Sequence, residues 1–288
     1  MADVGISSIA GYLPRLRLSK NSIAQANAWL APNLVGKGKG TRAMANWDED
    51  SVTMSVEAIR RILGENDDRS HVDSLFFAST TMPFSDRLNS GIIRAALTLE
   101  EETECIDIGS TLKSGTSALI QALDKVKSGN SNYSIVSVAD KRKARAASPQ
   151  ELDFGDASVA LSVDSDNLIA KYINSSSLSI DFIDHFRQPG EEFDYNWEER
   201  WIRDEGFSKI VPKAINDLFD KTNIDGSKID HFIIPSVFPR VDQMIAKKCG
   251  IDPDKVVNNM ALTVGNSGSA HALLMLASVL ELSLIHIS

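Results

Sequence analysis

The segment from Asp107 to Leu119 indicates a strand end, a sharp turn and the start of a helix built from small residues. The N-terminus of a helix stabilises negative charge, so it lowers the pKa of a nucleophilic thiol placed there. Gly115 and Thr116 permit a close approach to such a helix start. The turn itself carries Leu112, which has no nucleophilic atom, and Lys113, whose ammonium is suited to contact an acidic or carbonyl group.

Other polar side chains are candidates for a site built around this turn. Asn266 carries an amide that either donates to a carbonyl oxygen or stabilises its own turn, and the two interpretations stay open. His271 follows on a helix of small residues and is a candidate to line a substrate pocket, although lone histidines are more often structural. His185 lies in the irregular, aromatic-rich segment 184–203, where it is a candidate to shape a substrate mouth.

Basic loops and cysteines complete the set of reactive side chains. Lys37 and Lys39 alternate with glycines in a flexible basic loop that is suited to meet phosphate groups, although the phosphate-loop pattern is not matched. The charged run 140–145 is interpreted as a solvated loop, with contact to phosphate groups as the alternative. Cys105 and Cys249 lack metal-ligand spacing and are interpreted as reduced thiols that serve packing. We therefore expect no metal, and no cofactor apart from a group carried on the substrate.

Composition limits the classes of partner. The chain has 288 residues, 43% of them hydrophobic, and a formal net charge of -9. That acidic balance argues against a nucleic-acid partner or an anionic membrane surface and favours a cytoplasmic location. No apolar run reaches the length of a membrane-spanning helix, and the first residues do not open a signal peptide.

Periodicity predicts the elements that position these residues. Strands alternate with helices in both halves of the chain, which predicts an α/β fold with parallel βαβ units and a buried sheet. The predicted strands are 4–12, 74–79, 104–108, 133–139, 159–163, 168–173, 177–180 and 229–234, and the predicted helices are 50–63, 89–97, 115–127, 205–220, 241–248 and 269–280.

Five segments, in this order along the chain, resemble the initiating condensing enzymes of the thiolase superfamily. The nearest resemblance is to 3-hydroxy-3-methylglutaryl-CoA synthase of the archaeal and bacterial type, followed by ketoacyl synthase III. The segments are Val4-Gly5-Ile6 with Tyr12-Leu13-Pro14-Arg15, then 47–54, 112–118, Phe154-Gly155-Asp156 and 264–269.

This resemblance implies a thiolase-like five-layered αβαβα fold of two similar halves, residues 1–165 and 166–281. It also implies an acyl-CoA substrate, lipid metabolism, and a homodimer or a heteromer with a thiolase-like subunit, paired through Glu104–Ile108. We expect the second half to be incomplete at its C-terminal end. The stretch 282–288 has the appearance of a non-native tail.

The resemblance further implies that the family's three catalytic positions are vacant. The family pattern Ala-Cys-Lys-Ala-Gly-Thr is matched at Lys113, Gly115 and Thr116, with Leu112 in the place of the cysteine. The family's glutamate falls at Thr80, whose hydroxyl is not a general base near neutral pH. The family's histidine falls at Pro235.

Three functions remain open from the sequence. The first is acyl transfer or Claisen-type condensation on acyl-CoA thioesters, as the family performs it. The second is a catalytically silent subunit that binds acyl-CoA or scaffolds a thiolase complex, which the vacant positions favour. The third is thioester chemistry that needs no acyl-enzyme, such as a retro-aldol reaction.

Overall fold

A computed structural model of the protein describes residues 3–64 and 68–287, with side chains as far as Glu281. The chain forms two compact units. Unit 1 comprises Met1–Arg142, Ala146–Tyr172 and Met260–Ser288, and unit 2 comprises Lys143–Arg145 and Ile173–Asn259. No helix in the described part of the chain is long and apolar enough to cross a bilayer.

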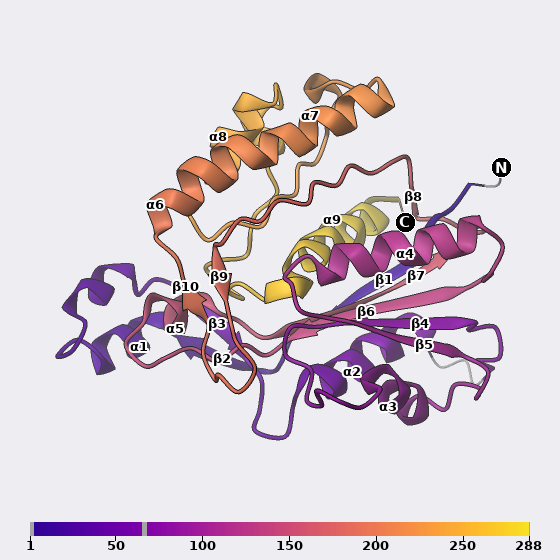
Figure 1. The fold of residues 1–288 in the computed structure, drawn as a ribbon, viewed down its shortest axis with the longest axis horizontal. Coiled ribbons are helices and arrows are strands. Elements are labelled where there is room, and N and C mark those ends of the chain that lie inside the picture. Colours follow the sequence, from indigo (N-terminus) through magenta and orange to yellow (C-terminus); the bar gives the residue numbers. More distant parts are fainter. Residues whose placement is uncertain (1–2, 65–67, 288) are drawn as a thin grey trace. The chain divides into compact units, whose positions relative to one another are not determined.

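Unit 1 is built on a six-stranded mixed sheet with the strand order β5-β4-β6-β7-β1-β8 (Figure 1). The strand β4 pairs in parallel with β5 and with β6, whereas β6–β7, β7–β1 and β1–β8 are antiparallel. Their bounds are β1 Gly5–Tyr12, β4 Ser74–Ala78, β5 Glu104–Ile108, β6 Ser134–Asp140, β7 Ala157–Asp164 and β8 Ala170–Lys171.

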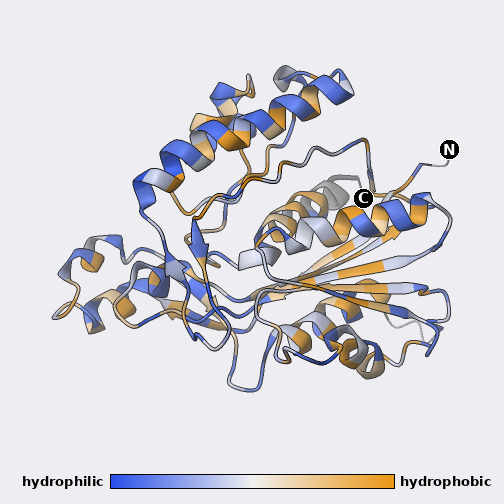
Figure 2. Cartoon of the chain, in the orientation of Figure 1, coloured by the Kyte–Doolittle hydropathy of each residue, from blue (hydrophilic) through white to orange (hydrophobic). Residues whose placement is uncertain are grey.

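Helices cover both faces of this sheet (Figure 1). The helices α2 (Ser51–Leu63) and α3 (Asn89–Ala96) lie on one face, and α4 (Ser114–Lys127) and α9 (His271–Ile287) lie on the other. Successive strand residues point to opposite faces, so Phe76 joins the core under α4 while Phe77 joins the core under α2. Because both faces are covered, the strands are apolar along most of their length (Figure 2).

A smaller lobe of unit 1 holds the hairpin of β2 (Leu16–Ser19) and β3 (Thr41–Met44), together with α1 (Lys20–Ala26), the 3-10 helix η1 (Pro32–Lys37) and α5 (Pro149–Asp153). The late segment 261–266 runs beside β3, because the Thr41 and Ala43 N–H groups donate to the carbonyls of Leu262 and Val264. This pairing brings the region of Asn266 to the sheet.

Unit 2 is mainly helical. It contains α6 (Glu199–Trp201), the π-helix η2 (Ile202–Ile210), α7 (Val211–Thr222) and α8 (Val241–Lys248), with short 3-10 turns η3 (Gly226–Lys228) and η4 (Pro253–Lys255). Its core gathers Val241, Ile245 and Ile251 with Phe207 and Phe219. The two-residue strands β9 (His185–Phe186) and β10 (Tyr195–Asn196) form a hairpin.

Two predicted strands of unit 2 are wrong. Residues 177–180 form no strand, and 229–234 contributes only an isolated bridge between Phe232 and Val256. A segment with strand-like composition forms a strand only when a neighbouring strand pairs with it. Neither segment has such a neighbour among the described residues of unit 2. The predicted helix 205–220 is a π-helix followed by α7, and the predicted parallel sheet is mixed.

The two compact units do not correspond to the two similar halves predicted from the sequence, residues 1–165 and 166–281. The division into similar halves stays a prediction. In unit 1, α9 follows the short 3-10 turn η5 (Gly268–Ala270). The predicted non-native tail, 282–288, lies outside the residues whose side chains are described.

Candidate functional site

The turn between β5 and α4 is a tight elbow. After β5, Ser110 adopts a left-handed backbone with φ of 69°, and α4 then begins at Ser114. The Ser114 N–H donates to the Thr111 carbonyl at 3.0 Å, which closes the turn. Leu112 is half-buried and Lys113 is exposed at the N-cap of α4. No side chain in the described part of the chain caps this helix start.

Gly115 fixes how closely α4 approaches the rest of the site. A Cβ at this position would lie 2.5 Å from the Ser269 carbonyl oxygen and 3.0 Å from a methyl group of Val138. Any larger residue would push the helix start away from η5 and β6. The missing side chain therefore brings the elbow and the Asn266 region of unit 1 together.

A buried carboxylate ties the loops around the elbow. Asp140, at the end of β6, has no exposed surface. Its Oδ1 accepts from the Ser79 hydroxyl (3.0 Å), the Thr80 N–H (2.7 Å) and the Thr81 hydroxyl (3.1 Å). Its Oδ2 accepts from the N–H (2.7 Å) and the hydroxyl (2.8 Å) of Ser269. Asp140 thereby connects the loop after β4 to the start of the last helix.

Asn266 is held mainly through its backbone. Its carbonyl accepts from Arg142 at 3.1 Å and from the Gly155 N–H at 3.0 Å. Its side-chain oxygen accepts from the Gly268 N–H at 3.0 Å, as in an Asx turn. The Arg142 guanidinium lies 3.8 Å from the centre of the Phe154 ring. The structure thus shows the turn-stabilising role of the Asn266 oxygen.

A second carboxylate supports the elbow from β5. Asp107 accepts from the Asn89 N–H at 2.7 Å and from the Ser90 N–H at 2.8 Å, which caps the start of α3. The Asn89 amide adds a bond of 3.0 Å to the same carboxylate. The strand that leads into the elbow is therefore fixed to a helix on the opposite face of the sheet.

The amino-acid sequence is similar to those of known proteins. No protein-family model matches the chain. The hydroxymethylglutaryl-CoA synthase of Caldivirga maquilingensis is 26% identical over 283 residues, covering 96% of this chain and 80% of the relative. The corresponding enzyme of Methanosphaera stadtmanae is 24% identical over 284 residues, with 97% and 81% covered.

Solved structures agree with the sequence comparison. An HMG-CoA synthase complexed with CoA superimposes with a TM-score of 0.85 at 18% identity, covering 97% of this chain and 75% of that one. A variant of Xanthomonas campestris OleA with bound lauric acid and lauroyl-CoA gives a TM-score of 0.84 at 18% identity, covering 98% and 91%. The chain has the fold of these enzymes and is similar in sequence to hydroxymethylglutaryl-CoA synthases. The predicted thiolase-like α/β fold is confirmed.

The predicted site residues divide between the two units. Leu112, Lys113, Thr80 and Asn266 belong to unit 1, where the elbow and the hydrogen bonds of Asp140 connect them. Pro235 is exposed in unit 2. The vacancy of the three family positions and the substrate contacts of the others stay predictions.

His271 is packed inside unit 1. Its side chain is only 3% exposed, and its Nδ1 lies 3.2 Å from the Ser267 hydroxyl and 3.3 Å from the Ser267 N–H. His271 is the first residue of α9, and its hydrogen-bond partner Ser267 lies four residues earlier in the chain. Lys37 and Lys39 are exposed at the end of η1 in the smaller lobe.

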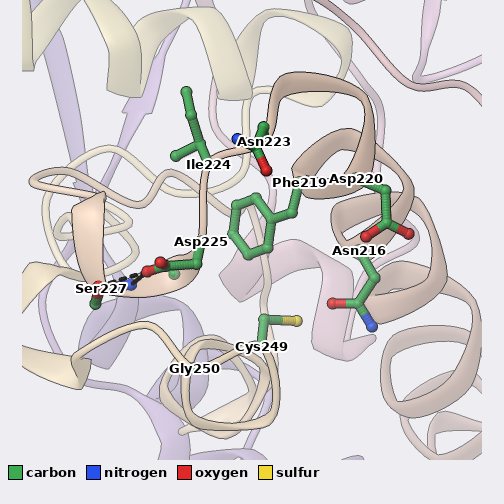
Figure 3. A pocket seen from close by; sticks show the side chains of 10 residues that line it. Asn216, Phe219, Asp220, Asn223, Ile224, Asp225, Ser227, Cys249 and Gly250 are labelled. Carbon is green, nitrogen blue, oxygen red and sulfur yellow. Dashed lines mark hydrogen bonds between the residues drawn. The ribbon is translucent and has the colours of Figure 1, made fainter.

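Neither cysteine has the environment of an activated thiol. Burial raises the pKa of Cys105, which is half-buried on β5. Burial also raises the pKa of Cys249, against a weaker opposite effect from Lys248. Cys249 lines a groove of about 610 Å³ in unit 2, between the ends of α7 and α8 (Figure 3). Both thiols are therefore protonated near neutral pH.

The groove beside Cys249 is lined by Phe219 and by short polar side chains, among them Asp220 and Asp225 (Figure 3). The Asp225 carboxylate is already engaged by the N–H and the hydroxyl of Ser227 at the start of η3. In unit 2, His185 Nδ1 donates to the Asp184 carboxylate at 2.8 Å, and Arg187 pairs with Asp194 at 2.8 Å.

Sequence reasoning missed Asp140 and Arg142. The prediction of a solvated loop over 140–145 is wrong for both, since Arg142 is only 7% exposed and Asp140 is fully buried. The available signal was the position of Asp140 directly after a buried apolar run. A carboxylate there ends a strand of the central sheet, where buried charge must find partners.

Proposed function

We propose that the protein binds acyl-CoA thioesters at the elbow of α4 and does so without forming an acyl-enzyme. The observation that carries this proposal is an intact elbow with Leu112 at its apex. The helix start that favours an anionic oxygen is still built, but leucine offers no atom for acylation. The relatives named for hydroxymethylglutaryl-CoA synthase and the structure with bound CoA support the ligand class.

Substrate contacts follow from the residues around the elbow. Lys113 and the first N–H groups of α4 are suited to a thioester carbonyl, with Asn266 and His271 supporting the adjoining loop. Thr80 offers no general base in place of a carboxylate. We assign the phosphates of coenzyme A to Lys37 and Lys39, whose exposed ammonium groups suit phosphate oxygens.

Assembly and location belong to the same proposal. The strand β5 is at the edge of the sheet and pairs only with β4 in the described part of the chain. An edge strand with an unpaired ladder is a template for a partner strand. We propose a homodimer, or a heteromer with a thiolase-like subunit, through Glu104–Ile108, in the cytoplasm.

The test combines binding with mass spectrometry. Isothermal titration with acetyl-CoA should give saturable binding, while the intact mass after incubation should equal that of the untreated protein. Leu112→Cys should acquire an acetyl group, because the helix start that lowers a thiol pKa is present. Leu112→Ala is the matched control and should stay unmodified.

Two results would overturn the proposal. An acetyl adduct on Cys105 or Cys249 of the wild-type protein would show covalent chemistry at another thiol. Absence of binding to acetyl-CoA, lauroyl-CoA and free CoA alike would remove the ligand class.

A further inference from the structure

Charge is distributed very unevenly along this acidic chain. No aspartate or glutamate occurs between Asp3 and Asp48, whereas six basic residues do: Arg15, Arg17, Lys20, Lys37, Lys39 and Arg42. The net charge of -9 is therefore an average over a basic N-terminal stretch and a more acidic remainder. An argument from the whole-chain charge does not apply to the surface that this stretch forms.

The stretch exposes large apolar side chains beside its lysines. Trp29 is 83% exposed and Leu30 is 60% exposed, in the turn that follows α1. Val35 is 38% exposed on η1, which leads into the exposed Lys37 and Lys39. These five residues are called the α1–η1 patch.

The patch extends along α1. A Cβ on Gly38 would touch Asn21 and Ala24, so Lys37 and Lys39 flank the first turns of that helix. Trp29 and Leu30 lie just beyond its other end. The helix has seven residues, which corresponds to about 10 Å between the cationic and the apolar parts of the patch.

The exposed side chains stand on an ordered base. Ile23, Ala24, Leu34 and Leu152 form a buried cluster under the patch. The N–H groups of Leu30 and Ala31 both donate to the Asn27 carbonyl, which fixes the turn. Trp29 and Leu30 therefore project from a folded turn and are not needed for the core beneath it.

Two acidic groups approach the patch from α5. Glu151 accepts from the Asn27 amide at 3.0 Å and from the Ala147 N–H at 2.7 Å. Asp153 is half-buried and faces the buried Lys20. Both are turned to internal partners, so the outer surface of the patch keeps its positive character.

We propose that the α1–η1 patch docks this protein on an anionic lipid bilayer. Trp29 and Leu30 enter the boundary between headgroups and acyl chains, and Lys37 and Lys39 contact the lipid phosphates. A bilayer demands no shape complementarity, so protruding apolar side chains beside cations suffice, whereas a protein partner requires a matching surface. Two lysines and two large apolar residues give reversible attachment, which salt weakens.

The experiment is flotation of the full chain with lipid vesicles. The protein should float with vesicles of equal parts phosphatidylcholine and phosphatidylglycerol, and should stay at the bottom with phosphatidylcholine alone. Trp29→Ala with Leu30→Ala should lower the bound fraction at least tenfold, and so should Lys37→Glu with Lys39→Glu. Melting temperatures should not change, because all four side chains are exposed.

Trp47→Ala is the matched control. Trp47 is 90% exposed, but it precedes Asp48, Glu49 and Asp50, so its surroundings repel an anionic bilayer. Its removal should leave flotation unchanged.

Fluorescence quenching by brominated lipids measures which tryptophan enters the bilayer. These lipids should quench the fluorescence of the Trp47→Phe variant, which retains Trp29, and leave that of the Trp29→Phe variant unquenched.

Several outcomes would overturn the proposal. Equal loss of flotation with Trp47→Ala would indicate unspecific adsorption. Failure of the wild type to float with the anionic vesicles would leave the patch without a lipid partner. Lysine variants that lose CoA binding but still float as the wild type would assign those lysines to coenzyme A alone. Flotation does not depend on acyl-CoA binding, so either proposal can fail without the other.

Discussion

The strands of the unit 1 sheet and the extended segment 229–234 of unit 2 are both apolar in sequence, but they differ in the partners that the fold gives them. In unit 1, every strand of the sheet has a partner, and the buried Asp140 joins two loops far apart in the chain. In unit 2, segment 229–234 has the apolar, β-branched composition of a strand and makes only an isolated bridge. Buried partners, rather than composition, distinguish the two regions.

Replacing Asp140 should have the largest effect. Asp140→Ala removes the buried carboxylate that accepts from the Ser79 hydroxyl, the Thr80 N–H and the Ser269 N–H. We expect a loss of about 3 kcal/mol or more in the free energy of unfolding, measured by urea denaturation. The matched change in unit 2 is Asp184→Ala, whose side chain is 47% exposed and whose loss should be about 1 kcal/mol or less. Equal losses would contradict the contrast between the two regions.

Adding a methyl group to a glycine in each unit should give a smaller effect. Gly115→Ala places a Cβ 2.5 Å from the Ser269 backbone oxygen, which cannot move without shifting the start of α9. We expect a destabilisation of about 1–3 kcal/mol and weaker acyl-CoA binding. In unit 2, Gly206→Ala meets the far edge of the Phe182 ring, a side chain that is able to turn aside.

Gly206→Ala should therefore cost less than Gly115→Ala in the same urea experiment. It should leave acetyl-CoA titrations unchanged. A larger loss at Gly206 would show that the π-helix, and not the elbow, is the tighter packing site.

The smallest effect concerns pH and has opposite signs in the two units. In unit 1, burial raises the pKa of Asp156, against weaker opposite effects from the Ala45 N–H and from Arg42. The folded state therefore binds this proton more strongly than the unfolded state, and the contribution of Asp156 to stability falls as pH rises above about 4. In unit 2, burial acts upward on Asp184 but the bonds from His185 outweigh it and lower its pKa.

For Asp184 the sign is reversed. Its stabilising contribution is present above its unfolded pKa of about 4 and is lost as pH falls below it. Relative to wild type, Asp156→Asn should gain stability as the pH rises above 4, whereas Asp184→Asn should gain stability as the pH falls below 4, in a series from pH 2 to 7. Urea denaturation across this range measures both. Parallel pH profiles for the two variants would contradict the assigned pKa directions.

The sequence by itself determined the central parallel strands of unit 1. The predicted strands 74–79, 104–108 and 133–139 agree with β4, β5 and β6 within one residue at each end. The elbow before α4 was also predictable, because a strand end, a turn and small helix-starting residues follow one another directly. These features depend on local periodicity and turn chemistry, which a short window contains.

Tertiary structure alone decided which strands pair and which charges are buried. The antiparallel contacts of β7 and β1, and the return of 261–266 to β3, join residues more than a hundred positions apart. In the sequence Asp140 has the context of a surface residue in a charged run, but in the fold it is buried and accepts from Ser269 of η5. A strand or a buried carboxylate is stable only with its partner, and the partner's identity is a property of the folded chain rather than of its local sequence.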